Sequence, residues 1–203
     1  MSMSRLSVCA DLINKKHKNY CLLDIGCRTM DLKPLLKNCK EYYGTDLLPP
    51  VKGVFQCDLE KKLEFNNNEF DVITALDVLE HIDNPHGALD EFYRIAKKAV
   101  YISLPNMFYI SFRIRFLLGG GISGKYTFHP HPVKDRHRWI LSYDEAIKFI
   151  EQNSKQYKVN KIDIIPERGR TKYILGPIEK YLAKIFPNAF VYGVLFEVII
   201  NDE

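Results

Sequence analysis

The sequence contains no long apolar run and no basic block. No apolar stretch reaches the roughly 18 residues that a membrane-spanning helix needs. The first residues lack the basic patch and apolar segment of a signal peptide. The 29 basic residues nearly balance the 25 acidic ones, and no run of five basic residues occurs. Electrostatics therefore give no reason to expect a nucleic-acid partner, and we expect a soluble, cytoplasmic protein.

Cysteines are too few and too scattered to hold the fold together by disulfide bonds. The chain has five of them, an odd number, and no C-x-x-C pair. Both observations argue against a disulfide framework and against a zinc ribbon, and they suit a reducing cytosol.

What the sequence does contain is an alternation of apolar strands and amphipathic helices. Its 203 residues, 46% of them hydrophobic, suffice for one well-buried domain, which we expect to span residues 1–203. The apolar pattern predicts strands near residues 20–25, 41–45, 53–57, 70–76, 99–104, 158–165 and 190–200. This order indicates a doubly wound, mostly parallel α/β sheet of about seven strands with an antiparallel C-terminal edge. The looser segment at about 106–139 predicts a lid or insertion.

Two of the intervening helices have clear start signals. Asn84 followed by Pro85 predicts the first turn of one helix. Ser142 with Glu145 three residues later is a capping box and predicts the start of another.

Acidic residues follow several of the predicted strands directly. Asp24, Asp46, Asp58 and Asp77 each come at the end of an apolar strand, and Gly26 follows the first of them. In an open parallel sheet the ligand crevice lies at the carboxyl ends of the strands, so we expect these residues to share one crevice. Asp46 comes 22 residues after Asp24. That spacing is close to the interval at which a dinucleotide-binding fold places a carboxylate on the ribose hydroxyls.

Glycines are scarce where a phosphate-binding loop would need them. After Gly26, Arg28 and Met30 stand at the positions where a glycine-rich loop has further glycines. A pyrophosphate needs the backbone amides that such glycines expose. The site therefore favours a nucleoside ligand without phosphates, and a nicotinamide-dependent enzyme is the weaker alternative.

The order of these segments resembles the class I S-adenosylmethionine-dependent methyltransferases. The segments that carry the resemblance are residues 23–27, 44–46, 57–59, 70–73 and 77–82. Within this superfamily, residues 104–106, 113–119, 139–142 and 186–188 resemble the MetW-like branch, also described as methyltransferase type 11. The resemblance spans nearly the whole chain. It implies a Rossmann-like domain with S-adenosylmethionine as cofactor.

The resemblance also implies which residues surround this cofactor, from the methionyl side through the ribose and adenine to the floor of the pocket. They are Asp24, Gly26 and Cys27 (methionyl side), Asp46 with Leu47 (ribose), Asp58 and Leu59 (adenine), and Leu76 and Asp77 (floor). Arg28 departs from the family motif. Its guanidinium could clamp the carboxylate of the cofactor, or it could occupy the space that the methionyl chain needs.

Methyl transfer from a sulfonium requires an aligned acceptor and, for a hydroxyl acceptor, a base. His81 is the candidate base because it follows the acids of the fourth strand, and Glu80 would orient it. The alternative is that both residues only cap and brace the next loop. For contacts with the acceptor we expect Asn106, His129, His131 and His137. Prolines follow the first two of these histidines and no matching Cys or Glu motif accompanies them, so we expect no metal site.

Two functions follow from these patterns. The first is a methyltransferase that moves a methyl group from S-adenosylmethionine to a small-molecule or sugar-type acceptor. The second is a catalytically inactive module of the same fold that binds a partner protein or a membrane surface through the aromatic and basic residues of segment 107–118. Arg28 is the feature that favours the second function.

Overall fold

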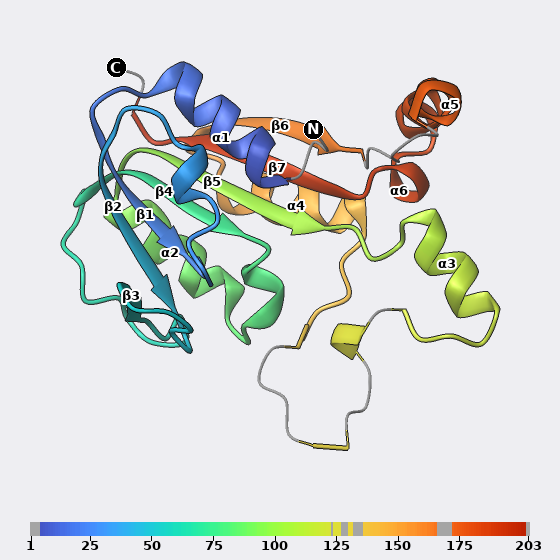
Figure 1. Ribbon diagram of the computed structural model, residues 1–203, viewed down its shortest axis with the longest axis horizontal. Coiled ribbons are helices and arrows are strands. Elements are labelled where there is room, and N and C mark those ends of the chain that lie inside the picture. Colours follow the sequence, from blue (N-terminus) through green and yellow to red (C-terminus); the bar gives the residue numbers. More distant parts are fainter. Residues whose placement is uncertain (1–4, 123, 127–129, 132–135, 166–171, 202–203) are drawn as a thin grey trace.

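One mixed β-sheet organises the chain. The structure, a computed structural model, describes residues 5–122, 124–126, 130–131, 136–165 and 172–201. Within these ranges seven strands form a single sheet in the order β3-β2-β1-β4-β5-β7-β6 (Figure 1). The strands are β1 (Tyr20–Ile25), β2 (Cys39–Asp46), β3 (Val54–Gln56), β4 (Phe70–Leu76), β5 (Ala96–Pro105), β6 (Lys158–Ile164) and β7 (Gly193–Ile199).

The sheet is parallel except at the strand that closes the chain. β7 pairs antiparallel with both β5 and β6, whereas the other pairs of neighbouring strands are parallel. The expected antiparallel pairing at the C-terminal edge is therefore present. β7 is shorter than the strand predicted over residues 190–200, because Pro187 starts a helical turn that lasts to Phe190.

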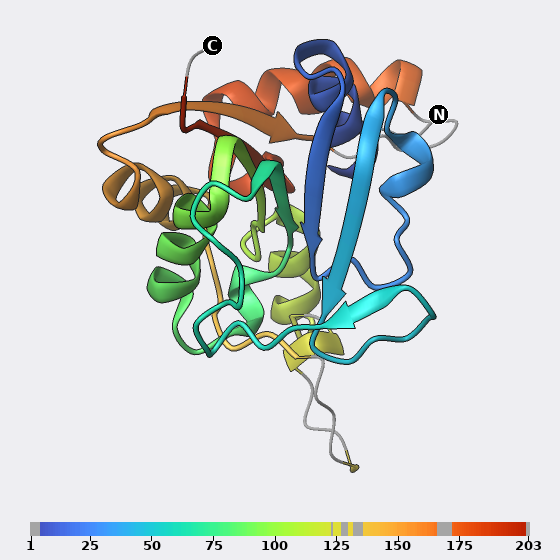
Figure 2. The ribbon, with the colours of Figure 1, turned by 90° about the vertical axis from the view of Figure 1, so that its left-hand side faces the viewer.

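Helices cover both faces of the sheet. They are α1 (Arg5–Lys16), α2 (Pro85–Ile95), α3 (Ile110–Leu117), α4 (Tyr143–Asn153), α5 (Lys172–Ile185) and α6 (Pro187–Phe190), with the 3-10 turns η1 (Lys33–Leu35), η2 (Leu79–His81) and η3 (Gly124–Tyr126). Figure 2 shows α2 and α4 on one side of the strands and α1 on the other. None of the helices in the described ranges is long and apolar enough to cross a membrane.

The alternation of side chains along the central strands produces the two cores. Leu22 belongs to the core that contains Cys9 and Ile13 of α1. Its neighbour Leu23 points to the opposite face, into the core that contains Leu89 of α2 and Ile150 of α4. A strand buried on both faces needs apolar residues at successive positions, which is why β1 is apolar at every position except Asp24.

Local signals in the sequence begin α2 and α4. The Asn84 side chain accepts a hydrogen bond from the Gly87 amide, and Pro85 occupies the first turn of α2. Ser142 and Glu145 make the predicted capping box at the start of α4.

The chain leaves the sheet after β5 and returns to it before α4. This excursion carries α3 and η3, and Figure 1 shows it on the right and below the sheet. It comes back against η2, where the Arg138 amide donates to the Glu80 carbonyl at 2.8 Å. The excursion corresponds to the segment that the sequence marks as a lid or insertion.

Candidate active site

A cavity of about 720 Å³ opens at the carboxyl ends of the parallel strands. In doubly wound folds, ligands bind at this end of the sheet. Twelve of the residues predicted for cofactor or acceptor line it: Asp24, Gly26, Cys27, Arg28, Asp46, Leu47, Asp58, Leu59, Leu76, Asp77, His81 and His137. The structure therefore brings together residues from the ends of four strands, β1 to β4, and from the segment that returns to η2.

The turn after β1 keeps a glycine-like backbone although two of its residues are not glycine. Gly26, Arg28 and Met30 have φ angles of 67°, 48° and 59°, all in the left-handed region. At Gly26 a side chain is also excluded by space, because a Cβ atom would lie 2.6 Å from Val78 Cγ2. The loop thus has alternating left-handed residues at the motif positions. Arg28 and Met30 adopt them at the cost of backbone strain.

Asp46 is held in place by this turn. Its carboxylate accepts hydrogen bonds from the backbone amides of Arg28 and Leu48, each at 3.1 Å. The residue is half-buried at the end of β2 and lines the cavity. Two amide donors fix the carboxylate beside the turn, where it can accept from a vicinal pair of hydroxyls.

Asp24 contributes mainly to the frame behind the cavity. Its buried carboxylate accepts from Tyr42 Oη at 2.5 Å and from Thr74 Oγ1 at 2.7 Å, which ties β1 to both neighbouring strands. Burial raises the pKa of Asp24 to about 6, although the two hydrogen bonds act in the opposite direction. Both oxygens of this carboxylate therefore accept hydrogen bonds from neighbouring strands.

The loops after β3 and β4 carry the residues predicted for the adenine and for the floor of the pocket. Asp58 is partly exposed, and an ion pair of 3.3 Å joins its carboxylate to Lys61. Asp77 has a φ of 55° and accepts from Ser103 Oγ at 2.5 Å. Arg5, at the start of α1, forms an ion pair of 2.9 Å with Asp77.

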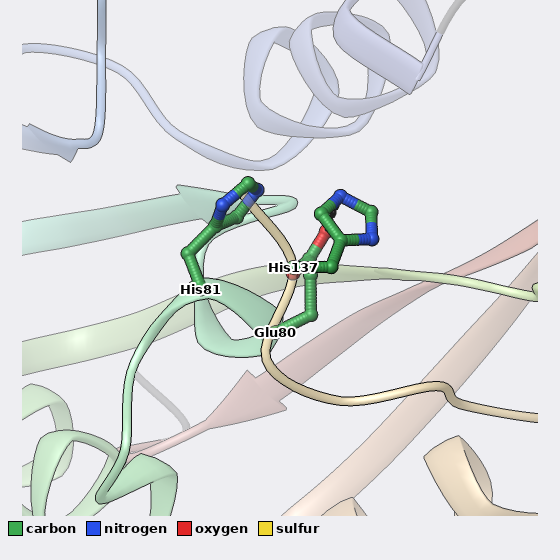
Figure 3. Close-up of side chains that lie close together, drawn as sticks. All are labelled: Glu80, His81 and His137. Carbon is green, nitrogen blue, oxygen red and sulfur yellow. Dashed lines mark ion pairs between the residues drawn. The ribbon is translucent and has the colours of Figure 1, made fainter. Parts of the chain in front are cut away.

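Glu80, His81 and His137 form a cluster (Figure 3), and its two histidines line the cavity. Glu80 is only 1% exposed, and burial raises the pKa of its carboxyl well above the usual range, with the charge of Asp77 adding to the effect. Within the described part of the chain, neither of its carboxylate oxygens has a hydrogen-bond partner. His137 Nε2 lies 3.8 Å from Glu80 Oε1, and the two imidazole rings meet edge to face with centroids 4.5 Å apart.

The remaining predicted acceptor contacts are placed differently. Asn106 is buried away from the cavity; its side-chain amide donates to the carbonyls of Asn188 and Val191 and its oxygen accepts from the Phe108 amide. Its hydrogen bonds fasten the chain between β5 and α6, so we give it a structural role rather than an acceptor contact. His131 is exposed to solvent, and His129 lies outside the described residues.

Other residues also line the cavity. Arg5 and Lys125 bring positive charge to it, and Met107, Phe112 and Tyr192 give it an apolar wall. Met107 and Phe112 belong to segment 107–118, which the sequence marks by its aromatic and basic residues. Arg5, Lys125 and Tyr192 were not predicted, because no local motif marks them and only the packing of distant segments brings them to the end of the sheet.

A sheet of this order, with β7 reversed beside β5 and an acid of β2 bound to a left-handed turn after β1, is the arrangement of the class I S-adenosylmethionine-dependent methyltransferases. The sequence comparison agrees. The chain belongs to the methyltransferase-domain family, whose model matches residues 4–142. The match is to the wider family and does not specify the MetW-like branch.

Relatives of known sequence or structure support the same assignment. The chain is 33% identical over 149 residues to the mitochondrial ubiquinone biosynthesis O-methyltransferase of Dictyostelium discoideum, covering 72% of this chain and 41% of that protein. It therefore spans less than half the length of this relative. An S-adenosylmethionine-dependent methyltransferase from Archaeoglobus fulgidus shares the fold with a TM-score of 0.60 and 18% identity, covering 97% of this chain and 95% of that one.

A small RNA methyltransferase also shares the fold. Its TM-score is 0.65 at 16% identity, over 98% of this chain and 25% of that one. At this identity the likeness concerns the fold alone. The expectation that nucleic acid is not a partner stays a prediction, because a nucleic-acid enzyme stands among the structural neighbours.

The residues of the cavity fit the cofactor of this class. The crowding at Gly26 and at Gly44, where a Cβ atom would lie 2.7 Å from Cys27 Sγ, keeps the backbone of the cofactor side free of side chains. The Asp46 carboxylate is aimed by two amides, and the Arg28 side chain is exposed at the rim instead of being packed inside.

Proposed function

We propose that this chain transfers a methyl group from S-adenosylmethionine to a hydroxyl oxygen of a small molecule. The observation that carries the proposal is the position of His81 and His137 on the wall of the same cavity that contains Gly26 and Asp46. A base beside the cofactor pocket suits an oxygen acceptor, because a hydroxyl must lose its proton as it is methylated. The relative from Dictyostelium discoideum, which is named as an O-methyltransferase, supports the same kind of acceptor.

Each part of the bound cofactor has a residue to receive it in this proposal. Asp46 would hold the ribose hydroxyls, Asp58 with Leu59 the adenine, and the exposed guanidinium of Arg28 the carboxylate of the methionyl group. The bound cofactor supplies a methyl group on a positively charged sulfur. The protein then has to align an acceptor oxygen with that methyl group and exclude competing water.

The acceptor end of the cavity has one apolar and one polar wall. Met107, Phe112 and Tyr192 supply the apolar wall, and the rings of the last two lie 5.9 Å apart. The polar wall holds the two histidines. This combination suits a flat apolar molecule that carries a hydroxyl, such as a hydroxylated ring, better than it suits a sugar with polar groups on all sides.

A hydrogen bond sets the protonation of His81. Its Nδ1 lies 3.0 Å from the Arg136 carbonyl oxygen, which can only accept, so Nδ1 carries the proton in the neutral ring. Nε2 is then the nitrogen with the lone pair. In this proposal it accepts the hydroxyl proton while the new oxygen–carbon bond forms and the sulfur–carbon bond breaks.

Calorimetry with S-adenosylhomocysteine tests the proposal. We expect one molecule bound per chain, and Asp46→Ala should weaken binding by about tenfold to a hundredfold because hydrogen bonds to a charged group are lost. Asp90→Ala, an exposed substitution on α2, is the matched control and should bind normally. A folded wild-type protein that binds nothing at millimolar S-adenosylhomocysteine would contradict the proposal.

A lipid surface is a second candidate partner, favoured by the outer side of α3. Phe116 and Leu117 are 63% and 83% exposed. Arg113 and Arg115 lie on the same short helix, and apolar residues next to basic ones suit an anionic membrane surface. Sedimentation with anionic vesicles tests this role: wild type should sediment with them and Leu117→Glu should not. Equal recovery of both proteins in the supernatant would exclude it.

A further inference from the structure

The Glu80 carboxylate is buried without the partners that such a group normally requires. It is 1% exposed, and within the described residues neither oxygen accepts a hydrogen bond. Burial of a carboxylate costs several kcal/mol unless hydrogen bonds or a cation compensate it. The ion-pair partner of Glu80, His137 Nε2, lies 3.8 Å from Glu80 Oε1, which is too far for a hydrogen bond. Among the described residues, the buried carboxylate therefore lacks a hydrogen-bond donor or a cation on the side that faces His137.

The two histidines of the cluster are held with the same nitrogen facing inward. His81 Nδ1 donates to the Arg136 carbonyl at 3.0 Å. His137 Nδ1 lies 3.2 Å from Tyr126 Oη, whose own proton goes to the Trp139 carbonyl, so the imidazole is the donor. In both rings Nε2 therefore carries the lone pair. A metal-binding histidine is normally fixed in this way, by donation from its other ring nitrogen to an oxygen.

In this arrangement, atoms that carry lone pairs lie close to one another. The Nε2 lone pair of His137 faces Glu80 Oε1, and one ligand atom from each residue of the cluster lies within 4.8 Å of the other two. Figure 3 shows the carboxylate and both rings gathered at one place, with Glu80 and His81 on η2 and His137 on the returning segment. Such donors repel each other unless a proton or a cation lies between them.

Hydrogen bonds from Arg138 and Trp139 to the backbone of residues 80–82 hold the two segments together. The Arg138 amide donates to the Glu80 carbonyl at 2.8 Å, and Arg138 Nε donates to the His81 carbonyl at 2.9 Å. Trp139 Nε1 donates to the Ile82 carbonyl at 2.8 Å. The three side chains are therefore positioned before any ligand arrives, which lowers the entropy cost of binding one.

We propose that Glu80, His81 and His137 bind a divalent transition-metal ion. One carboxylate and two imidazoles form a ligand set typical of zinc and related first-row ions, whereas magnesium prefers oxygen ligands throughout. Three protein ligands leave coordination positions open, and both histidines line the cavity, so the open side faces the acceptor. The sequence-based prediction of no metal site concerned a different set of ligands, His129 and His131 with a third histidine. The folded chain instead joins His137 to the Glu80–His81 pair.

The metal site also gives the acceptor hydroxyl a place to bind, a step that rests on the proposed function. The hydroxyl oxygen takes an open coordination position, and the ion lowers the pKa of the hydroxyl as a Lewis acid. Its proton leaves to water. The oxygen–carbon bond then forms as the sulfur–carbon bond of the cofactor breaks. With the ion bound, His81 Nε2 is a ligand and the ion replaces it as the activator of the hydroxyl.

Titration of metal-stripped protein with Zn²⁺ and with Mn²⁺, followed by calorimetry, tests the site. We expect one ion per chain for wild type. Glu80→Gln and His137→Ala should each weaken binding by about 100-fold or more, because each removes a direct ligand. His86→Ala is the matched control: this exposed histidine of α2 contacts Asn153, and its loss should leave the affinity unchanged. Circular dichroism checks that every variant is folded.

The outcomes separate the metal site from the proposed function. Folded wild type that binds neither ion, or Glu80→Gln that binds as tightly as wild type, overturns the metal site. S-adenosylhomocysteine is titrated into the same metal-free protein. If it binds while the metals do not, the proposed function stands alone. If the metals bind with the expected loss in both variants while S-adenosylhomocysteine does not bind, the metal site stands and the proposed function fails.

Discussion

The strained turn after β1 can be tested by comparing glycine and alanine at one position. Arg28 has a φ of 48°, in the left-handed region, which residues with a side chain adopt at a cost of about 1–2 kcal/mol. Arg28→Ala removes the guanidinium and keeps the Cβ atom that causes the strain. Arg28→Gly removes both. The difference in unfolding free energy between the two variants therefore isolates the backbone conformation.

The expected size of this difference follows from two opposing effects. Glycine relieves the left-handed strain of about 1–2 kcal/mol, but it raises the entropy of the unfolded chain by an amount that costs about 0.5–1 kcal/mol. We therefore expect Arg28→Gly to be more stable than Arg28→Ala by about 1 kcal/mol. At Asp90, an exposed position inside α2, the order should be reversed, with glycine less stable than alanine by about 1 kcal/mol.

Urea unfolding of the four variants, monitored by circular dichroism, measures both differences. If glycine is not the more stable residue at position 28 while the control shows the usual order, residue 28 does not hold a left-handed conformation. Binding of S-adenosylhomocysteine to the same proteins also decides the role of the guanidinium. A clamp on the carboxylate of the cofactor predicts weaker binding in both Arg28 variants, whereas an obstruction predicts tighter binding in both.

Three further changes test the frame of the site by urea unfolding. Burial raises the pKa of Asp24 to about 6, so the folded state binds more protons than the unfolded state between the two pKa values. Stability should therefore fall by about 3 kcal/mol as pH rises from about 3 to about 7. Asp24→Asn should flatten this part of the stability curve, and an unchanged slope would contradict the assignment. Gly44→Ala would place a methyl group 2.7 Å from Cys27 Sγ. This crowding should lower the unfolding free energy by about 1–3 kcal/mol and weaken S-adenosylhomocysteine binding. A variant as stable as wild type would show that the strand can move aside. Ser142→Ala removes one half of the capping box with Glu145 and should cost about 1 kcal/mol without changing ligand affinity; a loss of affinity would mean that α4 positions the site.

The sequence by itself determined the sheet and the edge of the sheet at which the cavity lies. β4 was predicted over residues 70–76 and has those bounds, because a short and mostly apolar run between polar turns is typical of a strand buried on both faces. Asp46, Asp58 and Asp77 follow strands that run in the same direction. Residues at the carboxyl ends of parallel strands meet at one edge of the sheet, so local pattern and topology together place them around one cavity.

Only the tertiary structure decided what the acceptor end of this cavity contains. Asn106 lies directly after β5 and was predicted to contact the acceptor. In the folded chain its side-chain amide donates instead to the carbonyls of Asn188 in α6 and Val191 in the following loop. His137 lies in a segment without helical or strand periodicity, and long-range hydrogen bonds to η2 bring it to Glu80. Contacts between segments this distant depend on packing of the whole chain rather than on local pattern. For that physical reason the sequence predicts the cofactor side, and the folded chain reveals the cluster opposite it.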